Sequence, residues 1–254
     1  MTSLPSEPFS LHGGCHCKAI RYTISFPKFD ERPVLNPNHP PGQPDVKAPL
    51  ICFDHCSDCR SASGVPVQIW NICPQKFITF SLLRRCDDAS GSSGPVSDSN
   101  NARVDITGDQ LVHPSETAKE TYLTYYASSK SVWRTFCSRC GTNMSFVAFE
   151  EAGSETLMDL GVGTLDHESL QLVGMPQRHI WWDSGVDWVK RLTAEGDAGS
   201  SRNALPKHSG GDIYEIIQEN ENNEPSLMTC CIPLLPFAAA MQWYRHSQYL
   251  NICE

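Results

Sequence analysis

The cysteines of this sequence fall into close pairs whose spacing suits a metal ion. The 254-residue chain has 12 cysteines, and six of them form the pairs Cys15–Cys17, Cys56–Cys59 and Cys137–Cys140. A Cys-x-x-Cys turn places two thiolates on one edge of a tetrahedral zinc site. The pairs therefore predict thiolate ligation of zinc, with distant parts of the chain sharing an ion.

Two of the pairs can close a structural site together. A Cys-x-Cys such as Cys15–Cys17 needs a partner pair, and Cys137–Cys140 is followed by Gly141, which suits the left-handed backbone of a zinc-binding turn. We expect these four thiolates to hold one zinc that contributes directly to folding. The alternative is that one pair is simply buried thiol, but that does not account for two spaced pairs.

The stretch ICFDHCSDCRSASG (51–64) is then short of ligands. A structural zinc closes its shell with four protein ligands, whereas a catalytic zinc keeps one position open. If Asp54 lies on an extended strand, its carboxylate faces the same side as Cys56, so that Asp54, Cys56 and Cys59 hold an open site. Cys52 shares that face, and His55 would need a turn to reach in. The alternative for Asp54 is a carboxylate that faces solvent or supports a ligand.

Bulk properties narrow the class of protein. The net charge of −9 argues against a nucleic-acid partner, which requires a basic surface. The first residues, MTSLPSEPFSLHGG, lack the apolar core of a secretory signal, so we expect a reducing, cytoplasmic setting and metal rather than disulfides. The apolar segment 227–243 is too short and too interrupted by proline for a membrane helix, so we expect no membrane partner.

Short alternating or β-branched segments separated by glycine, proline and serine predict a mainly β fold. The expected strands are 19–26, 65–72, 120–127, 143–150, 155–163 and 178–183. Residues 27–49 are proline-rich and residues 87–103 almost lack apolar side chains, so both should be irregular surface insertions, and the second, with 195–211, mobile. A zinc-binding domain over 11–192 would precede a linker and C-terminal tail over 193–254.

The motifs also resemble a known family. GGCHCKAIRY, DHCSDCRSASG, YYASSKSVWRTFCSRCGTNM, GVGTLD and MPQRHIWWDSGVDW occur in the order seen in the glutathione-dependent formaldehyde-activating enzyme family, which includes the centromere protein V branch and has the Mss4-like fold. The resemblance covers roughly residues 11–192. It implies a β-sheet domain with two zinc ions per chain. The structural ion would be held by Cys15, Cys17, Cys137 and Cys140, and the catalytic ion by Asp54, Cys56 and Cys59.

At Asp54 the family pattern has a cysteine, so the resemblance leaves the reaction open. The family's reaction joins glutathione and formaldehyde and is classed as a carbon–sulfur lyase activity, which implies a small-molecule substrate such as a glutathione adduct. The harder carboxylate makes the zinc a stronger Lewis acid, so a lyase, dehydratase or isomerase acting on another metabolite is an alternative. A non-catalytic zinc-stabilised binding module is another.

Other side chains are candidates for supporting roles in substrate binding or packing. Arg60 and Arg134 could pair with a substrate carboxylate or form surface salt bridges. We expect His179 to be a hydrogen-bonded core or edge histidine. The tryptophans Trp181, Trp182 and Trp188 should pack, although one could line a pocket. Five cysteines lack partner spacing and are interpreted as ordinary thiols, namely Cys73, Cys86, Cys230, Cys231 and Cys253.

Overall fold

The computed structural model describes residues 4–35, 45–85, 103–111, 116–148 and 157–195. Residues 1–196 form one compact unit, and residues 197–254 lie outside the described residues. The segments expected to be mobile, 87–103 and 195–211, lie outside them except for Arg103, which begins a strand, and Glu195, which ends a helix. The apolar segment 227–243 also lies outside the described residues. No helix in the described ranges is long and apolar enough to cross a membrane.

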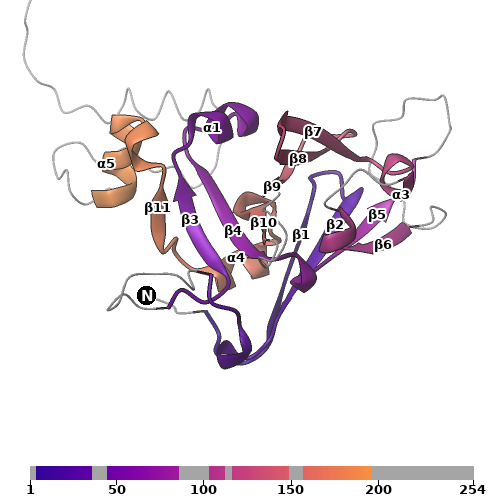
Figure 1. Ribbon diagram of the computed structural model, residues 1–254, viewed down its shortest axis with the longest axis horizontal. Coiled ribbons are helices and arrows are strands. Elements are labelled where there is room, and N and C mark those ends of the chain that lie inside the picture. The colour runs from indigo at the N-terminus through magenta and orange to yellow at the C-terminus, as the bar shows by residue number, and fades with distance from the viewer. Residues whose placement is uncertain (1–3, 36–44, 86–102, 112–115, 149–156, 196–254) are drawn as a thin grey trace, which may run out of the picture. The chain divides into compact units, whose positions relative to one another are not determined.

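The fold is mainly β, as expected, and consists of two sheets (Figure 1). The four-stranded sheet has, in spatial order, β1 (Phe9–Gly14), β2 (Ile20–Phe26), β5 (Ile78–Leu83) and β6 (Arg103–Thr107). The seven-stranded sheet has β11 (Arg178–Ile180), β3 (Leu50–Asp54), β4 (Gln68–Pro74), β10 (Leu157–Gly161), β9 (Asn143–Ala148), β8 (Val132–Cys137) and β7 (Leu123–Ser129).

Helices are short and were not predicted. The described α-helices are α1 (Ser57–Ser63), α2 (Gly108–Leu111), α3 (Glu116–Lys119), α4 (His167–Val173) and α5 (Asp187–Glu195). In Figure 1, α1 lies at the ends of β3 and β4, and α5 lies beside β11. The proline-rich insertion is irregular where it is described, apart from a single 3-10 turn at Phe29–Glu31 and an isolated bridge between Val34 and Lys47.

All six strands expected from the sequence are present, with ends that differ by a few residues. Alternation explains the agreement for β2, where the even-numbered side chains are buried and the odd-numbered ones are partly or fully exposed. Strand β3 escaped detection because its sequence, LICFD, is buried on both faces and does not alternate.

The main core lies between the sheets. Buried side chains of the four-stranded sheet, such as Ile24 and Phe80, share one cluster with Ile51 and Leu160 of the seven-stranded sheet. The opposite face of the larger sheet forms a second, smaller cluster of Cys52, Cys59 and Trp70. Because neighbouring residues of a strand point to opposite faces, the larger sheet packs against the main core on one face and carries a separate set of side chains on the other.

Replacing Phe80 with alanine should destabilise the fold strongly, because its ring is fully buried between the sheets. Loss of a buried phenylalanine side chain costs about 3–5 kcal/mol. Urea unfolding of Phe80→Ala should therefore show a much lower midpoint than the wild type. Tyr126→Ala is the matched control, since Tyr126 is 58% exposed and its loss should change stability by about 0.5 kcal/mol or less. Equal effects of the two substitutions would contradict a core at this place.

Candidate metal centres

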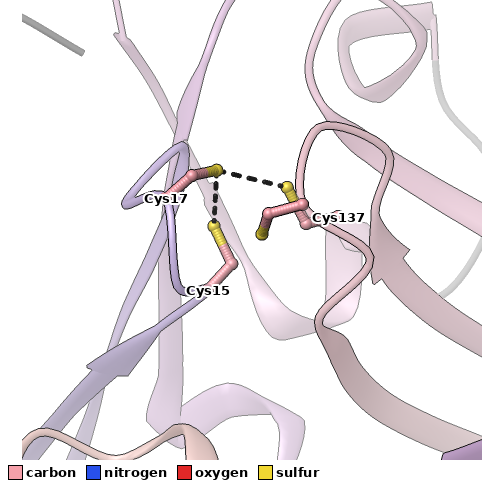
Figure 2. Close-up of side chains that lie close together, drawn as sticks. Cys15, Cys17 and Cys137 are labelled. Atoms are coloured by element: carbon pink, nitrogen blue, oxygen red, sulfur yellow. Dashed lines mark hydrogen bonds between the residues drawn. The ribbon is translucent and has the colours of Figure 1, made fainter. Parts of the chain in front are cut away.

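Two hairpin turns from different sheets bring four thiols together. Cys15 and Cys17 lie in the turn between β1 and β2. Cys137 is the last residue of β8, and Cys140 lies in the turn between β8 and β9. Their four Sγ atoms all lie within 4.8 Å of one another. Figure 2 shows Cys15 and Cys17 approaching from one turn and Cys137 from the other. The structure thus assembles the four residues expected for the closed site.

The two turns are built alike. The backbone N–H of Cys15 donates to the carbonyl of Ile20, five residues later, and that of Cys137 donates to the carbonyl of Thr142. Each turn contains one residue with positive φ, which is Lys18 in the first and Gly141 in the second. The left-handed backbone expected at Gly141 is therefore confirmed, with a φ of 74°. Lys18 takes the same kind of conformation although it has a Cβ, and nothing in the sequence predicts this.

The sulfur spacing fits a tetrahedral metal ion. The Sγ atoms of Cys15 and Cys17 are 3.5 Å apart, and those of Cys17 and Cys137 are 3.7 Å apart. Zinc–sulfur bonds of about 2.3 Å in a tetrahedron separate the sulfurs by about 3.8 Å. Cys137 is fully buried and Cys15 nearly so. The cluster can therefore hold a metal ion without rearrangement of the two turns.

Electrostatics also favour a cation among these thiols. A hydrogen bond with Cys15, together with burial, raises the pKa of the Cys137 thiol far above its ordinary value. Burial acts in the same direction on Cys140, but hydrogen bonds from Thr142 and from the backbone of Cys17 and Thr142 outweigh it and lower the pKa of that thiol to about 6. Four thiolates this close repel one another, and a divalent cation removes that cost.

The second cluster consists of Asp54, Cys56 and Cys59, whose ligand atoms also lie within 4.8 Å of one another. The reason that we gave for this grouping is wrong. Strand β3 ends at Asp54, and Cys56 is the N-cap of α1 rather than the next residue on the same strand face. The chain turns between the strand and the helix, and this turn places the Cys56 thiol near the Asp54 carboxylate. Cys59, in the first turn of α1, is buried on the helix side that faces the sheet.

The carboxylate of Asp54 is buried and held in place by two donors. Its Oδ1 accepts the backbone N–H of Cys56 at 2.8 Å, and its Oδ2 accepts the indole N–H of Trp70 at 2.9 Å. Trp70 can reach it because Cys52, two residues before Asp54 on β3, pairs with Trp70 on β4. An ionised carboxylate has about four lone-pair sites, so each oxygen keeps one for a metal ion. The arrangement fits metal ligation by a preoriented oxygen.

Cys52 and His55 lie outside this three-residue group. Cys52 is fully buried, and burial, with the nearby charges of Asp159 and Asp54, raises the pKa of its thiol to about 12. The Nε2 atom of His55 lies 3.0 Å from Nδ1 of His179, and the two rings stack. His179 sits on the edge strand β11, so the expectation of a hydrogen-bonded edge histidine is confirmed.

The tryptophans depart from the expectation of packing. Trp181 and Trp188 are mostly exposed, and Trp182, which is 38% exposed, meets the two histidine rings edge-on and lies under the Lys190 ammonium. The reason is that β11 ends at Ile180 and Trp181 takes a left-handed conformation, so the alternation of the strand does not continue.

Neither arginine forms an ion pair with another residue in the described ranges. Nη1 of Arg60 donates to the carbonyl oxygens of His55 and Ser184, each at 2.6 Å, and so ties α1 to the turn after β11. Arg134 is 5% exposed, and its Nη2 donates to Sγ of Cys59 at 3.5 Å. The burial of Arg134 excludes a surface salt bridge there. The guanidinium of Arg60 donates to backbone carbonyl oxygens instead.

Sequence reasoning missed Asp159, which lies on the face of the sheet that carries the second cluster. On β10 it pairs with Ile72 of β4 and Phe146 of β9, and Phe146 in turn pairs with Arg134. Burial and the charge of Asp54 raise the pKa of Asp159 to about 8, although Arg134 opposes the shift. The one available signal in the sequence was a charged residue between the apolar neighbours of LMDLG, and the structure places Asp159 on the half-buried face of that strand.

The cysteines that were interpreted as ordinary thiols fit that interpretation where they are described. All eight described cysteines are free. Cys73 is buried in the main core and belongs to neither cluster, whereas Cys86, Cys230, Cys231 and Cys253 lie outside the described residues.

A scan against protein-family models finds no match. A search of curated proteins finds none either.

If the four-thiol cluster holds a structural ion, Cys137→Ser should release one metal ion per chain and lower Tm by on the order of 10 °C or more, because metal binding is part of the folding free energy. Metal analysis after gel filtration and a thermal melt would measure both. Cys73→Ala is the control, since it also alters a fully buried thiol but should keep the metal count. An unchanged metal count in Cys137→Ser would contradict the site.

The raised pKa of Asp159 predicts a pH effect on stability. A carboxyl with a raised pKa in the folded state contributes stability below its unfolded value of about 4, and this stability is lost as pH rises to about 8. Asp159→Asn mimics the protonated form. Its free energy of unfolding should therefore increasingly exceed that of the wild type as pH rises from 4 to 8, with a difference of at least about 1 kcal/mol after allowance for solvent screening. Melts of both proteins across this range test the expectation, and parallel curves would contradict it.

Proposed function

We propose that the chain is a zinc-dependent enzyme of the carbon–sulfur lyase type that acts on a small thiol adduct. The observation that supports it best is the contrast between the two clusters, because one offers four ligands and the other offers three. A closed four-ligand shell suits a structural zinc, whereas three protein ligands leave a position for substrate or water.

The family resemblance supports the same proposal. The two ligand sets that it implies coincide with the two clusters, including the assignment of the open set to Asp54, Cys56 and Cys59. We accordingly propose an Mss4-like fold and membership of the glutathione-dependent formaldehyde-activating family. A cytoplasmic location and a glutathione adduct as substrate belong to this proposal.

In the proposed reaction, the thiol of glutathione adds to formaldehyde. The sulfur–carbon bond forms, the π electrons of the carbonyl move to its oxygen, and the thiol proton ends on that oxygen. A zinc ion at the second cluster would lower the pKa of the thiol and polarise the carbonyl. The chain's own contribution is to orient the ligands. The indole of Trp70 and the backbone of Cys56 fix the Asp54 carboxylate, and α1 presents Cys56 and Cys59.

A second enzymatic candidate follows from the carboxylate. Asp54 donates less charge to a metal ion than a thiolate does, which strengthens the Lewis acid and favours substrates that bind through oxygen. A lyase, dehydratase or isomerase step on another small metabolite would then replace thiol chemistry. The non-catalytic binding module gains no support from a buried, preoriented three-ligand cluster.

A comparison of Asp54→Ala with Asp54→Cys tests the proposal. The wild type should bind two zinc ions per chain, and Asp54→Ala should bind one, because it removes a ligand from the second cluster. Asp54→Cys should keep two and shift the preference toward thiol substrates. Zinc counting by elemental analysis and turnover of glutathione with formaldehyde, then with other aldehydes and oxygen-bound substrates, provide the readouts.

Asp58→Ala is the matched control, because Asp58 is an exposed acidic residue in α1 outside the cluster. It should leave zinc content and turnover unchanged. Full zinc occupancy in Asp54→Ala would show that Asp54 is not a ligand. Two zinc ions with turnover confined to substrates that lack a thiol would favour the second candidate.

A further inference from the structure

Arg134 is a buried cation that reaches the second cluster from four strands away. It lies on β8, and its cross-strand partner on β9 is Phe146. The guanidinium carbon lies 4.9 Å from the centroid of the Phe146 ring, and Nη2 donates to Sγ of Cys59 at 3.5 Å. The side chain therefore crosses the face of the sheet, above β9, toward the first turn of α1.

The guanidinium has no carboxylate partner among the described residues. Its Nη1 is buried and has no hydrogen-bond partner there, and none of the ion pairs between described residues includes it. Asp159 is the nearest acidic residue along the same cross-strand row, but it makes no hydrogen bond to Arg134 in that part of the chain, and burial raises its pKa to about 8. A buried unpaired charge is costly, so Arg134 needs a source of negative charge.

The second cluster provides one. Two thiolates and a carboxylate carry three negative charges, and a divalent cation among them leaves one uncompensated. That residual charge is buried, since Asp54 and Cys59 are at most 4% exposed. The guanidinium of Arg134 is a cation, and it touches one of the three ligands directly.

We propose that Arg134 is the built-in counter-charge of the Asp54–Cys56–Cys59 cluster, and that its guanidinium neutralises the single negative charge left when the cluster holds a divalent metal ion. This role rests on the metal occupancy in the proposed function. Arg134 is a positioning residue here, since its guanidinium donates to a ligand rather than to substrate.

Comparison with the four-thiol cluster shows why the second cluster needs a counter-charge. Two thiols of the four-thiol cluster, Cys17 and Cys140, are only partly buried, whereas Cys56 alone is so in the second cluster, and solvent can therefore stabilise part of the larger excess charge of the four-thiol cluster. The N–H of Ile20 also donates to Sγ of Cys15 at 3.2 Å. In the second cluster, Arg134 donates to Sγ of Cys59, which also shares a hydrogen bond with Asp54, and the indole and backbone donors go to Asp54.

A substitution series at Arg134 separates charge from shape. Lysine keeps the charge, glutamine keeps a hydrogen-bond donor without the charge, and methionine keeps only bulk. Zinc affinity of the second cluster, measured by competition with a chelator on the full chain, should stay within a few-fold in Arg134→Lys. It should fall by roughly tenfold or more in Arg134→Gln and Arg134→Met, because a unit charge a few ångströms away shifts a binding equilibrium at least that much.

Arg32→Met is the matched control. Arg32 is also buried and also packs on aromatic rings, but its hydrogen bonds go to backbone carbonyls. Its loss should lower stability without changing zinc affinity at the second cluster. In every variant, retention of zinc by the four-thiol cluster reports that the domain is folded.

The outcomes are distinct. A graded loss that follows charge supports the proposal. Equal affinities in the wild type and Arg134→Met, with two zinc ions in each, would overturn the counter-charge while leaving the proposed function in place. Equal losses in lysine and methionine variants would show that Arg134 acts through its shape, which also overturns it. A wild-type chain that takes up a single zinc ion would overturn the second metal site itself.

Discussion

The fold brings four thiols from two different β-sheets within a few ångströms of one another, and the rest of the domain depends on this approach. Cys15 and Cys17 end the first hairpin of the four-stranded sheet, and Cys137 and Cys140 end a hairpin of the seven-stranded sheet. The main core packs between the same two sheets. A metal ion at this point would therefore connect the sheets at one end while apolar burial holds them along their length, so that loss of either should loosen both.

The face of the larger sheet that lies away from the main core is where chemistry can occur. Side chains there come from β3, β4, β8, β9 and β10, and α1 covers them. Because the sheet is anchored by the main core on its other face, the positions of Asp54, Trp70 and Arg134 are fixed by strand pairing rather than by flexible loops. Oppositely charged groups then share a site from which solvent is largely excluded, where each interaction is stronger than at the surface.

The metal clusters could be predicted from the local spacing of their residues in the sequence. The side chains around the clusters could not, because cross-strand register brings them there. The paired cysteines and Gly141 are neighbours in the chain, so turn geometry alone indicated what they form. Asp54 was placed in the right cluster for the wrong reason, because the strand-to-helix turn at His55 cannot be read from alternation. Arg134 and Asp159 approach the cluster only because β8, β9, β10 and β4 pair in one particular register. That register depends on non-local contacts that a single sequence does not reveal.

The central claim is that the chain holds two metal ions in unlike coordination, one by four sulfurs and one by two sulfurs and a carboxylate oxygen. Zinc K-edge X-ray absorption of the fully loaded chain measures the average ligand set directly. The account predicts an average of three sulfurs per zinc at about 2.3 Å, with the remainder oxygen at about 2.0–2.2 Å. An average of four sulfurs per zinc would mean that only the closed cluster binds metal, and would contradict the account.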